Sequence, residues 1–293
     1  MSASYMKLNN RLVAFFDVLG FSKRLRTIDM ESLYSEYAAL LDKVNSTVFE
    51  QRETVAAHGD RAEQVRPANN FALTQIVSDS IILISQDIND IGAVSRFVMA
   101  SVLLMEECFT AQFPLRGTIA VSDVLVDKAR SILLSPVIPA LLAAEHIQEW
   151  SGCYILEGSE QLVANALCGT RFVQQGMPEK AQLPIIRYAV PTKDPTMGTG
   201  TRLCLNWPYL LDRDQLAKGT AFLGGRKRDE TAQFIRHIFD LPNQAQPLPP
   251  ECSPACFVRY RVTRSQFMAR FFDADGRHEP SPGRPISWRA YEE

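Results

Sequence analysis

The chain has 293 residues, 46% of them hydrophobic, and a formal net charge of −2 at pH 7. This length and this apolar content are sufficient for one large folded domain or two small ones. A net charge near zero provides no wide positive field, so neither a nucleic acid polymer nor an anionic membrane is expected as a partner.

The N-terminal residues contain no apolar signal-peptide core, and no run approaches the roughly 18 apolar residues that a membrane-spanning helix needs. Membrane insertion is therefore not expected, and the sequence predicts a cytoplasmic protein. The six cysteines are spread along the chain, a usage typical of reduced thiols rather than of a disulfide framework.

The first predicted element is a strand over residues 12–18 that ends in a carboxylate. Residues 11–22 read Arg-Leu-Val-Ala-Phe-Phe-Asp-Val-Leu-Gly-Phe-Ser, so Asp17 interrupts an apolar run. A buried carboxylate is costly unless it is paired or bound to a metal. Gly20 permits close approach of the backbone, and the turn into the next helix offers free N–H groups to an anion. The segment therefore predicts a metal site beside a phosphate site.

A second carboxylate, Asp79, stands in the segment Gln75-Ile-Val-Ser-Asp-Ser-Ile-Ile-Leu-Ile84. Before it, the pattern predicts a helix from about residue 30 and a surface loop over residues 51–70. Strands over residues 71–77 and 81–85 would place Asp79 at the tip of a β-hairpin. Two strand-borne carboxylates suit Mg²⁺ or Mn²⁺, which share one or two protein carboxylates with substrate phosphates.

The pattern continues with a helix over residues 91–111, a strand over 115–122 that is hairpin-linked to 124–134, and a helix over 139–150. The predicted order to this point is βαββαββα. Three further strands are expected over residues 153–156, 184–190 and 201–207, and residues 212–239 are mostly helical in pattern. The proline-rich residues 241–254 predict an exposed connection, and the tail after residue 273 is predicted to be poorly ordered.

This order of elements, with its two carboxylates, resembles the catalytic domain of class III nucleotidyl cyclases over roughly residues 10–210. Phe16-Asp-Val-Leu-Gly-Phe-Ser22 is similar to the first metal motif of that family, and Ser78-Asp-Ser80 stands where the second metal Asp belongs. Pro114-Leu-Arg-Gly-Thr-Ile-Ala120 resembles the strand after the second helix. Within the class, these segments, with Tyr188-Ala-Val-Pro191 and Leu205-Asn-Trp-Pro208, are most similar to the cyclic-pyrimidine cyclases of bacterial Pycsar antiphage systems.

The resemblance implies an α+β fold with a βαββαβ core, an antiparallel sheet and helices on one face. Residues 1–210 would form the cyclase-like catalytic domain, and residues 211–293 would form a C-terminal extension of unknown role. It also implies a pyrimidine nucleoside triphosphate as the substrate, a homodimer with composite active sites, and a separate effector protein that responds to the cyclic nucleotide.

By the same resemblance, Asp17 and Asp79 would bridge two Mn²⁺ or Mg²⁺ ions, with the backbone carbonyl of Val18 as a further ligand. One ion would lower the pKa of the ribose 3′-hydroxyl, and the other would hold the triphosphate and neutralise the leaving diphosphate. Arg116 is the best nearby candidate for charge stabilisation. Its place at the start of a strand also fits an ordinary salt bridge.

The predicted substrate contacts are Phe16, Gly20, Phe21, Ser22, Tyr37 and Gln75. Backbone N–H groups of residues 20–22 would cradle phosphates. Gln75 occupies the position, four residues before the second metal Asp, where purine cyclases carry Lys or Glu. Its amide offers a donor and an acceptor, which match the N3–H and O4 edge of uracil and, after a flip, also cytosine. Tyr37 could contact a pyrimidine, although its helical phase fits packing better.

The segment 139–149 lacks the Asn and the Arg that stabilise the transition state in many class III cyclases. Three readings therefore stay open: conversion of UTP to 3′,5′-cyclic UMP and diphosphate as the signal-producing step of antiphage defence, the same reaction on CTP, and a catalytically inactive nucleotide-binding regulatory module. A palm-type polymerase or cyclic-dinucleotide synthase shares the two-metal logic, but the chain has no GGDEF-like acidic sequence.

Overall fold

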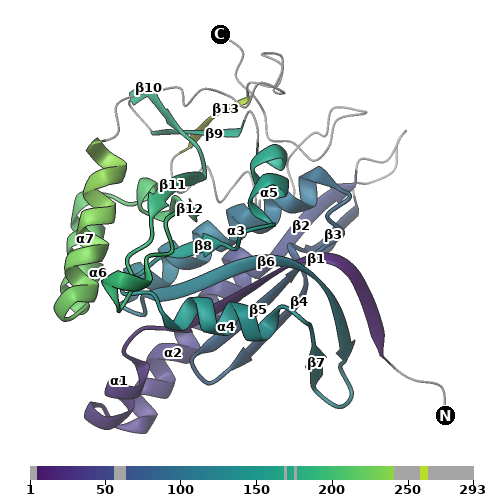
Figure 1. Ribbon diagram of the computed structural model, residues 1–293. Helices are drawn as coiled ribbons and strands as arrows, with labels where there is room; N and C mark the ends of the chain where they lie inside the picture. Colours follow the sequence, from purple (N-terminus) through teal and green to yellow (C-terminus); the bar gives the residue numbers. More distant parts are fainter. Residues whose placement is uncertain (1–4, 56–63, 168–169, 175–176, 241–257, 263–293) are drawn as a thin grey trace.

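The computed structural model of the protein describes residues 5–55, 64–167, 170–174, 177–240 and 258–262 (Figure 1). Within these residues, eight strands form one sheet. They are β1 (Met6–Val18), β4 (Phe71–Val77), β5 (Ser80–Ser85), β6 (Leu115–Asp127), β7 (Ile132–Leu134), β8 (Cys153–Ile155), β11 (Ile185–Ala189) and β12 (Thr201–Leu205).

The α-helices of the described residues are α1 (Phe21–Thr27), α2 (Met30–Val44), α3 (Ile91–Thr110), α4 (Ile138–His146), α5 (Glu160–Ala166), α6 (Arg213–Phe222) and α7 (Gly225–Asp240). Shorter helical turns are η1 (Asn45–Phe49), η2 (Pro195–Met197) and η3 (Trp207–Leu210). Outside the main sheet, β2 (Glu50–Val55) pairs with β3 (Gln64–Asn69), and β9 (Thr170–Gln174) lies between β10 (Met177–Gln182) and β13 (Val258–Val262).

The main sheet has the strand order β11-β12-β8-β6-β1-β5-β4, with β7 paired to β6. Neighbouring strands are antiparallel except for the parallel pair of β6 and β8. The chain order β1, α2, β4, β5, α3, β6 is the βαββαβ core that the sequence predicts. The predicted α+β fold class is therefore confirmed.

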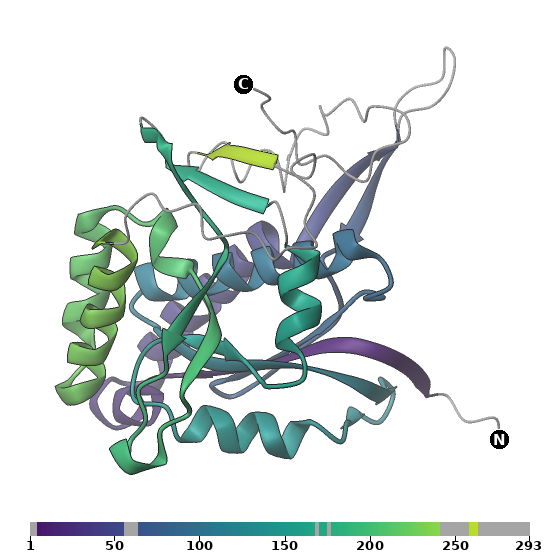
Figure 2. The same ribbon diagram turned by 45° about the horizontal axis from the view of Figure 1, so that its top comes forward.

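The sheet carries a core on each face because successive side chains of a strand point to opposite sides. The even-numbered residues 12–18 of β1 join the large core with α2 and α3, whereas Val13 and Phe15 join a smaller core with Leu141 of α4. Figure 2 shows α3 and α4 on opposite sides of the sheet. Asp17 lies two residues after Phe15 on the strand, so its side chain is on the same face of the sheet as α4. The helices of the βαββαβ core, α2 and α3, lie on one face as predicted, whereas α4 covers the opposite face.

Helix α3 is the central packing element of the large core. Its apolar residues are buried nearly all round, among them Val94, Phe97 and Leu104, each at most 1% exposed. Each such side chain stabilises the fold by about 1.5 to 3 kcal/mol when it leaves water. Asp90 caps the helix by accepting a hydrogen bond from the N–H of Gly92 at 2.9 Å. The predicted helix over residues 91–111 is confirmed.

Several predicted boundaries are wrong. Residues 51–70 were expected to form a loop, but β2 and β3 make an antiparallel hairpin there. The predicted hairpin within residues 115–134 is present, but its turn lies at residues 128–131, between the long strand β6 and the short β7, rather than at residue 123. The cause is pairing with β1, which starts at residue 6 rather than 12 and keeps β6 extended as far as residue 126. The predictions for residues 241–254 and for the tail after residue 273 lie outside the described residues.

The C-terminal helices α6 and α7 pack against this core (Figure 1). Gly219 of α6 lies so close to Phe109 of α3 that an added Cβ would sit 2.2 Å from its ring. In α7, the ring of Phe234 meets that of Trp150 edge-on, with centroids 4.7 Å apart. The hydroxyl of Thr231 accepts a hydrogen bond from the N–H of Ser151 at 2.8 Å. Helix α6 is thus tied to α3, and α7 is tied to the segment that leads into β8.

The three cysteines described, Cys108, Cys153 and Cys204, are free and buried. The described helices include none that is both long enough and apolar enough to cross a membrane.

Candidate active site

The predicted carboxylates Asp17 and Asp79 meet at one end of the main sheet. Asp17 pairs with Ser80 across β1 and β5. The N–H of Val18 donates a hydrogen bond of 3.0 Å to the carbonyl of Asp79, which ties the end of β1 to the β4–β5 turn. In that turn, Ser78 has a φ of 55°, a left-handed conformation that lets the chain reverse tightly. The fold therefore brings the two carboxylates together, and both are half-buried.

The Asp17 carboxylate stands in a surplus of negative charge. Its pKa is raised from 3.8 to about 6, first by burial and then by the charges of Glu145 and Asp79. Arg116 and Lys193 lower the pKa but do not cancel the rise. A cation bound at this point would relieve the unfavourable charge, and an all-oxygen donor set fits Mg²⁺ or Mn²⁺.

A metal at this position would need ligands beyond the two aspartates. In the part of the chain that the structure describes, no three His, Cys, Asp or Glu side chains form a metal-binding group. Mg²⁺ is commonly held by one or two carboxylates together with water and substrate phosphates. The residues present therefore fit a divalent ion that arrives with a phosphate substrate better than a closed structural metal site.

The turn after β1 has the shape that the sequence predicts. Gly20 adopts a φ of 78°, and its carbonyl accepts hydrogen bonds of 3.0 and 3.1 Å from N–H groups in the first turn of α1. No described side chain caps this helix start. Phe21 and Ser22 thus form the start of α1, shortly after Asp17 in the chain. Binding of phosphate by the backbone N–H groups of residues 20–22 remains a prediction. The side chain of Val18 is 2% exposed, so only its backbone carbonyl could contribute a metal ligand.

Gln75 lies on the edge strand β4, on the same face of the sheet as Asp17. It pairs with Ile82 of β5, and Ile82 in turn pairs with Phe15, two residues before Asp17. From the spacing of strands and residues, the Cα atoms of Gln75 and Asp17 are about 12 Å apart. Gln75 is half-buried. A nucleotide could reach it only by lying across this face from its phosphates at Asp17.

Tyr37 is packed in an aromatic group at the large core. Its ring lies between those of Phe21 and Phe113, at centroid distances of 5.2 and 5.4 Å. Burial raises the pKa of the hydroxyl, and the nearby charges of Asp79 and Asp17 add to the effect. The hydroxyl oxygen is buried and has no hydrogen-bond partner within the described residues. The ring therefore serves packing, while the hydroxyl is an unused polar group close to the carboxylates.

The side chain of Phe16 does not support the predicted substrate contact. It is fully buried in the large core, on the opposite face of the sheet from Asp17. An added Cβ on Gly117 would sit 2.3 Å from its ring. Because a residue next to Asp17 on a strand must point to the other side, Phe16 packs the site from behind.

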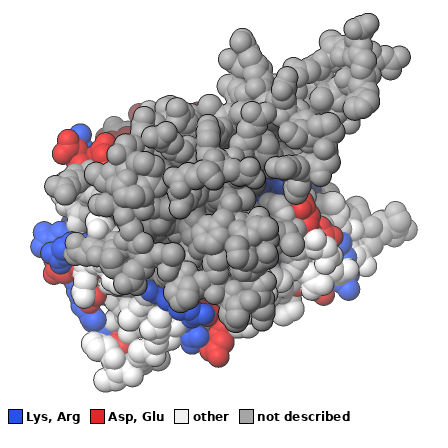
Figure 3. All heavy atoms as spheres, turned by 90° about the horizontal axis from the view of Figure 1, so that it is seen from above, with Lys and Arg blue, Asp and Glu red and all other residues white. Residues whose placement is uncertain are grey.

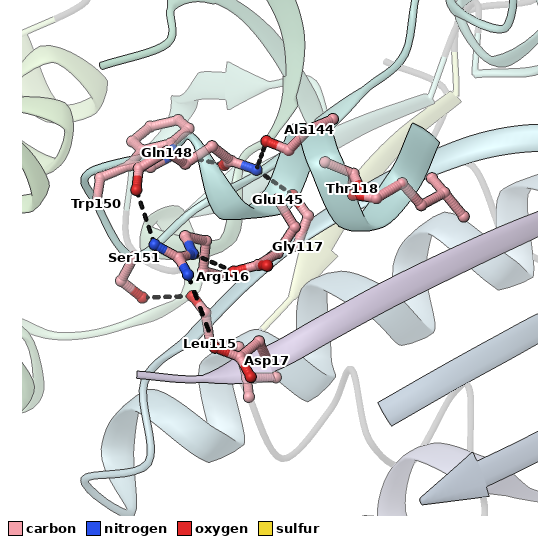
Figure 4. A network of polar contacts seen from close by, with 11 residues as sticks. Asp17, Leu115, Arg116, Gly117, Thr118, Ala144, Glu145, Gln148, Trp150 and Ser151 are labelled. Atoms are coloured by element: carbon pink, nitrogen blue, oxygen red, sulfur yellow. Dashed lines mark hydrogen bonds and ion pairs between the residues drawn. The ribbon is translucent and has the colours of Figure 1, made fainter. Parts of the chain in front are cut away.

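Arg116 lies beside Asp17 in the middle of a polar network (Figure 4). Its side chain is 6% exposed and its Nη2 lies 3.8 Å from the Oδ2 of Asp17. The Nε of Arg116 donates to Oε1 of Glu145 on α4, and its Nη1 donates to the backbone carbonyl of Gln148 at 2.8 Å. Two of the three guanidinium nitrogens are thus engaged away from Asp17. The predicted role of Arg116 in charge stabilisation stays a prediction.

The structure adds three residues that the sequence did not indicate: Glu145, Gln148 and Lys193. Glu145 and Gln148 belong to the segment 139–149, for which the sequence indicates only that the Asn and the Arg of many class III cyclases are absent. Lys193 follows β11 in the loop before η2, and its pKa is lowered by burial and by the charges of Arg116 and Lys227. No local pattern could identify these residues, because only the tertiary fold brings them to Arg116 and Asp17.

The described surface that is seen from above in Figure 3 carries charges of both signs. Figure 3 shows Lys or Arg next to Asp or Glu along the rim of the upper face. Among the ion pairs, Arg202 lies 3.0 Å from Glu157, and Arg187 lies 3.4 Å from Glu160. Such exposed pairs contribute little to stability, at most about 1 kcal/mol each.

No family model matches the chain, and no curated protein matches it. Solved structures with a similar fold include the adenylyl cyclase CyaB from P. aeruginosa, at 9% identity and a TM-score of 0.43 over 69% of this chain and 95% of that chain. The guanylate cyclase domain of RhGC from Catenaria anguillulae, in complex with GTP, has 10% identity and a TM-score of 0.41 over 68% and 96%. The guanylyl cyclase Cya2 has 11% identity and a TM-score of 0.40 over 72% and 99%. Likenesses at this level leave activity and substrate open, so these must be argued from the site.

Proposed function

We propose that this protein is a nucleotidyl cyclase that converts UTP to 3′,5′-cyclic UMP and diphosphate. The observation that supports the proposal most is the meeting of Asp17 and Asp79, where the hydrogen bond from Val18 to the Asp79 carbonyl ties β1 to the β4–β5 turn. The surplus negative charge at Asp17 adds to this support. The motifs around both aspartates resemble those of the bacterial Pycsar cyclases.

In this reaction the ribose 3′-oxygen bonds to the α-phosphorus, the bond from that phosphorus to the β-phosphate oxygen breaks, and diphosphate leaves. Asp17, Asp79 and the carbonyl of Val18 would hold Mn²⁺ or Mg²⁺. When bound, such ions lower the pKa of the ribose 3′-hydroxyl and neutralise negative charge on the leaving diphosphate. With a pKa of about 6, Asp17 is ionised at pH 7 and above and can act as a ligand. Arg116 and Lys193 add positive charge beside it.

The choice of UTP rests on Gln75. It lies on the face of Asp17 at the edge strand and is half-buried, so its amide is available to a base on that face. A neutral amide can donate to O4 and accept from N3–H of uracil. The unused hydroxyl of Tyr37 is a second polar group near the carboxylates. The same amide, flipped, would accept cytosine, which makes CTP the alternative substrate.

The proposal extends to a homodimer in which two copies complete each site. Val77 is the last residue of β4, and its side chain lies on the same face of the sheet as Asp17. It is 57% exposed, which is unusual for a large apolar side chain beside a polar site. A second copy that covers this side of the sheet would bury it. The setting we propose is cytoplasmic antiphage signalling, in which a separate effector protein binds the cyclic nucleotide. Size-exclusion chromatography with light scattering tests the dimer.

The cyclase proposal is tested by incubating the purified full chain with ATP, GTP, CTP or UTP in Mn²⁺ and identifying the products by mass. Cyclic UMP as the main product is the expected result, and Asp79→Asn should abolish it. Cyclic CMP instead would retain the cyclase but refute the choice of base. The absence of a cyclic product from every nucleotide, in a chain that also fails to bind Mn²⁺ with UTP, would overturn the proposal.

A second candidate, a regulatory module that binds nucleotide without turnover, is favoured by one observation. Segment 139–149 lacks the Asn and the Arg of many cyclases, and its Glu145 engages the nearby Arg116 instead of leaving it free for the substrate. Tight binding of UTP with Mn²⁺ and no product would favour this candidate.

A further inference from the structure

The guanidinium of Arg116 makes an ion pair with Asp17, but it does not close to a hydrogen bond. Its Nη2 lies 3.8 Å from the Asp17 Oδ2, beyond the length of a charge-assisted hydrogen bond. Arg116 and Glu145 are each 6% exposed at the side chain, so the pair they form is screened little by water. A guanidinium that closed on Asp17 in a two-pronged pair would occupy the oxygens that a metal needs.

Helix α4 is fixed in the place from which Glu145 reaches Arg116. The Thr118 hydroxyl donates to the carbonyl of Leu141 at 2.9 Å, which ties α4 to β6. Beyond the end of the helix, the Gln148 side-chain amide donates to the carbonyls of Gly117 at 3.0 Å and Ala144 at 3.2 Å. These bonds hold both ends of α4 on the strand that carries Arg116 (Figure 4).

The fixation continues into the C-terminal helix. Trp150, which is fully buried, donates from Nε1 to the side-chain oxygen of Gln148 at 2.8 Å. Its ring stacks on Tyr188 at a centroid distance of 5.4 Å and meets Phe234 of α7 edge-on. The backbone that carries Glu145 is therefore fixed, and the carboxylate that Arg116 can still pair with when Glu145 is removed is that of Asp17.

We propose that Glu145 is a positioning residue that holds Arg116 away from Asp17 and so keeps the Asp17 carboxylate open to a divalent cation. The inference rests on the proposed function, because it gives Asp17 a metal to bind. The positioning role of Glu145 on α4 is not indicated by the sequence motifs around Asp17 and Asp79. Glu145 and Asp17 compete for one guanidinium, and the fold favours Glu145.

The test is a crystal structure of full-length Glu145→Gln without metal, together with Mn²⁺ titration followed by electron paramagnetic resonance. The expected distance from Arg116 Nη2 to the nearer Asp17 oxygen is that of a hydrogen bond, below about 3.2 Å. The affinity for Mn²⁺ should fall about tenfold, since a charge-assisted hydrogen bond to Asp17 must be broken for the metal to bind. A structure in which Arg116 keeps its present distance from Asp17 would overturn the inference.

A matched control, Glu149→Gln, removes another carboxylate from the same segment, but Glu149 is a charge neighbour of Lys193 and is not among the residues that Arg116 contacts. Its Mn²⁺ affinity should change less than threefold, and an equal loss in both variants would refute positioning. If Glu145→Gln fails to fold, Glu145→Asp keeps the charge with a shorter reach and should still weaken Mn²⁺ binding. Failure of the wild-type chain to bind Mn²⁺ even when UTP is present would instead count against the proposed function, while the distance in the metal-free variant still tests Glu145.

Discussion

Replacing Asp17 by Asn should stabilise the metal-free protein at neutral pH while removing its function. The unfolded chain has an Asp pKa near 3.8, and the folded chain raises it to about 6. Between these values the folded state keeps a proton that the unfolded state loses, so stability falls as pH rises through this window and the full loss is present above pH 6. The loss amounts to about 3 kcal/mol, an upper limit because the side chain is 27% exposed.

An Asn at position 17 never ionises, so this variant should recover that free energy at pH 7.5 and none of it near pH 3.5. For a chain of this size the gain corresponds to a rise of about 5 °C in Tm. The assay is thermal unfolding followed by circular dichroism at several pH values, with and without Mn²⁺. Saturating Mn²⁺ should stabilise the wild-type chain by about 2.7 kcal/mol at one hundred times Kd, and the variant should lose most of this gain.

The matched control is Asp42→Asn, an exposed carboxylate on α2, whose replacement should change stability by at most about 0.5 kcal/mol. A destabilised Asp17→Asn protein at pH 7.5, or one that matches the control at every pH, would refute the reasoning that Asp17 carries unfavourable charge.

Three further predictions follow from the site and its packing. Asp79→Asn should abolish turnover and leave the far-ultraviolet circular dichroism spectrum unchanged, because Asp79 is tied to β1 through its backbone carbonyl rather than its side chain; a fully active variant would exclude it as a metal ligand. Gln75→Ala should lower kcat/KM for UTP about tenfold, because hydrogen bonds to the base are lost, and should leave Tm unchanged. If steady-state kinetics show that the variant still prefers UTP to ATP as before, another residue recognises the base. Gly117→Ala should destabilise the fold by about 1 to 3 kcal/mol in urea unfolding, because its Cβ would meet the Phe16 ring at 2.3 Å. Gly198→Ala, where nothing lies within 4 Å of the new Cβ, should be nearly neutral, and equal losses in both variants would contradict this packing.

The sequence predicted those parts of the fold whose signal is local. An apolar run that ends in a carboxylate and a glycine marked the end of β1, and two short apolar runs around Asp79 marked the β4–β5 hairpin. Both aspartates were found for this reason. Residues 51–70 read as a loop because their polar composition gives no apolar alternation, yet the two halves pair as β2 and β3.

What the sequence could not indicate depends on contacts between distant segments. Glu145 influences Asp17 by its charge and by its bond to Arg116, which lies 29 residues away in the chain. Lys193 reaches the same place from the loop after β11. The packing of Gly219 on Phe109 likewise arises only when α6 meets α3. Such contacts leave no periodic trace in the sequence.

The measurement that tests the central claim most directly is a competition between the four nucleoside triphosphates at equal concentration, with Mn²⁺ and the purified chain. The products are separated, identified by mass and quantified together with released diphosphate. The account predicts cyclic UMP and diphosphate in equal amounts, with neither formed by the Asp79→Asn variant. Linear UMP with diphosphate, or UDP with phosphate, would contradict it, because either pair shows attack by water where the ribose 3′-oxygen is required.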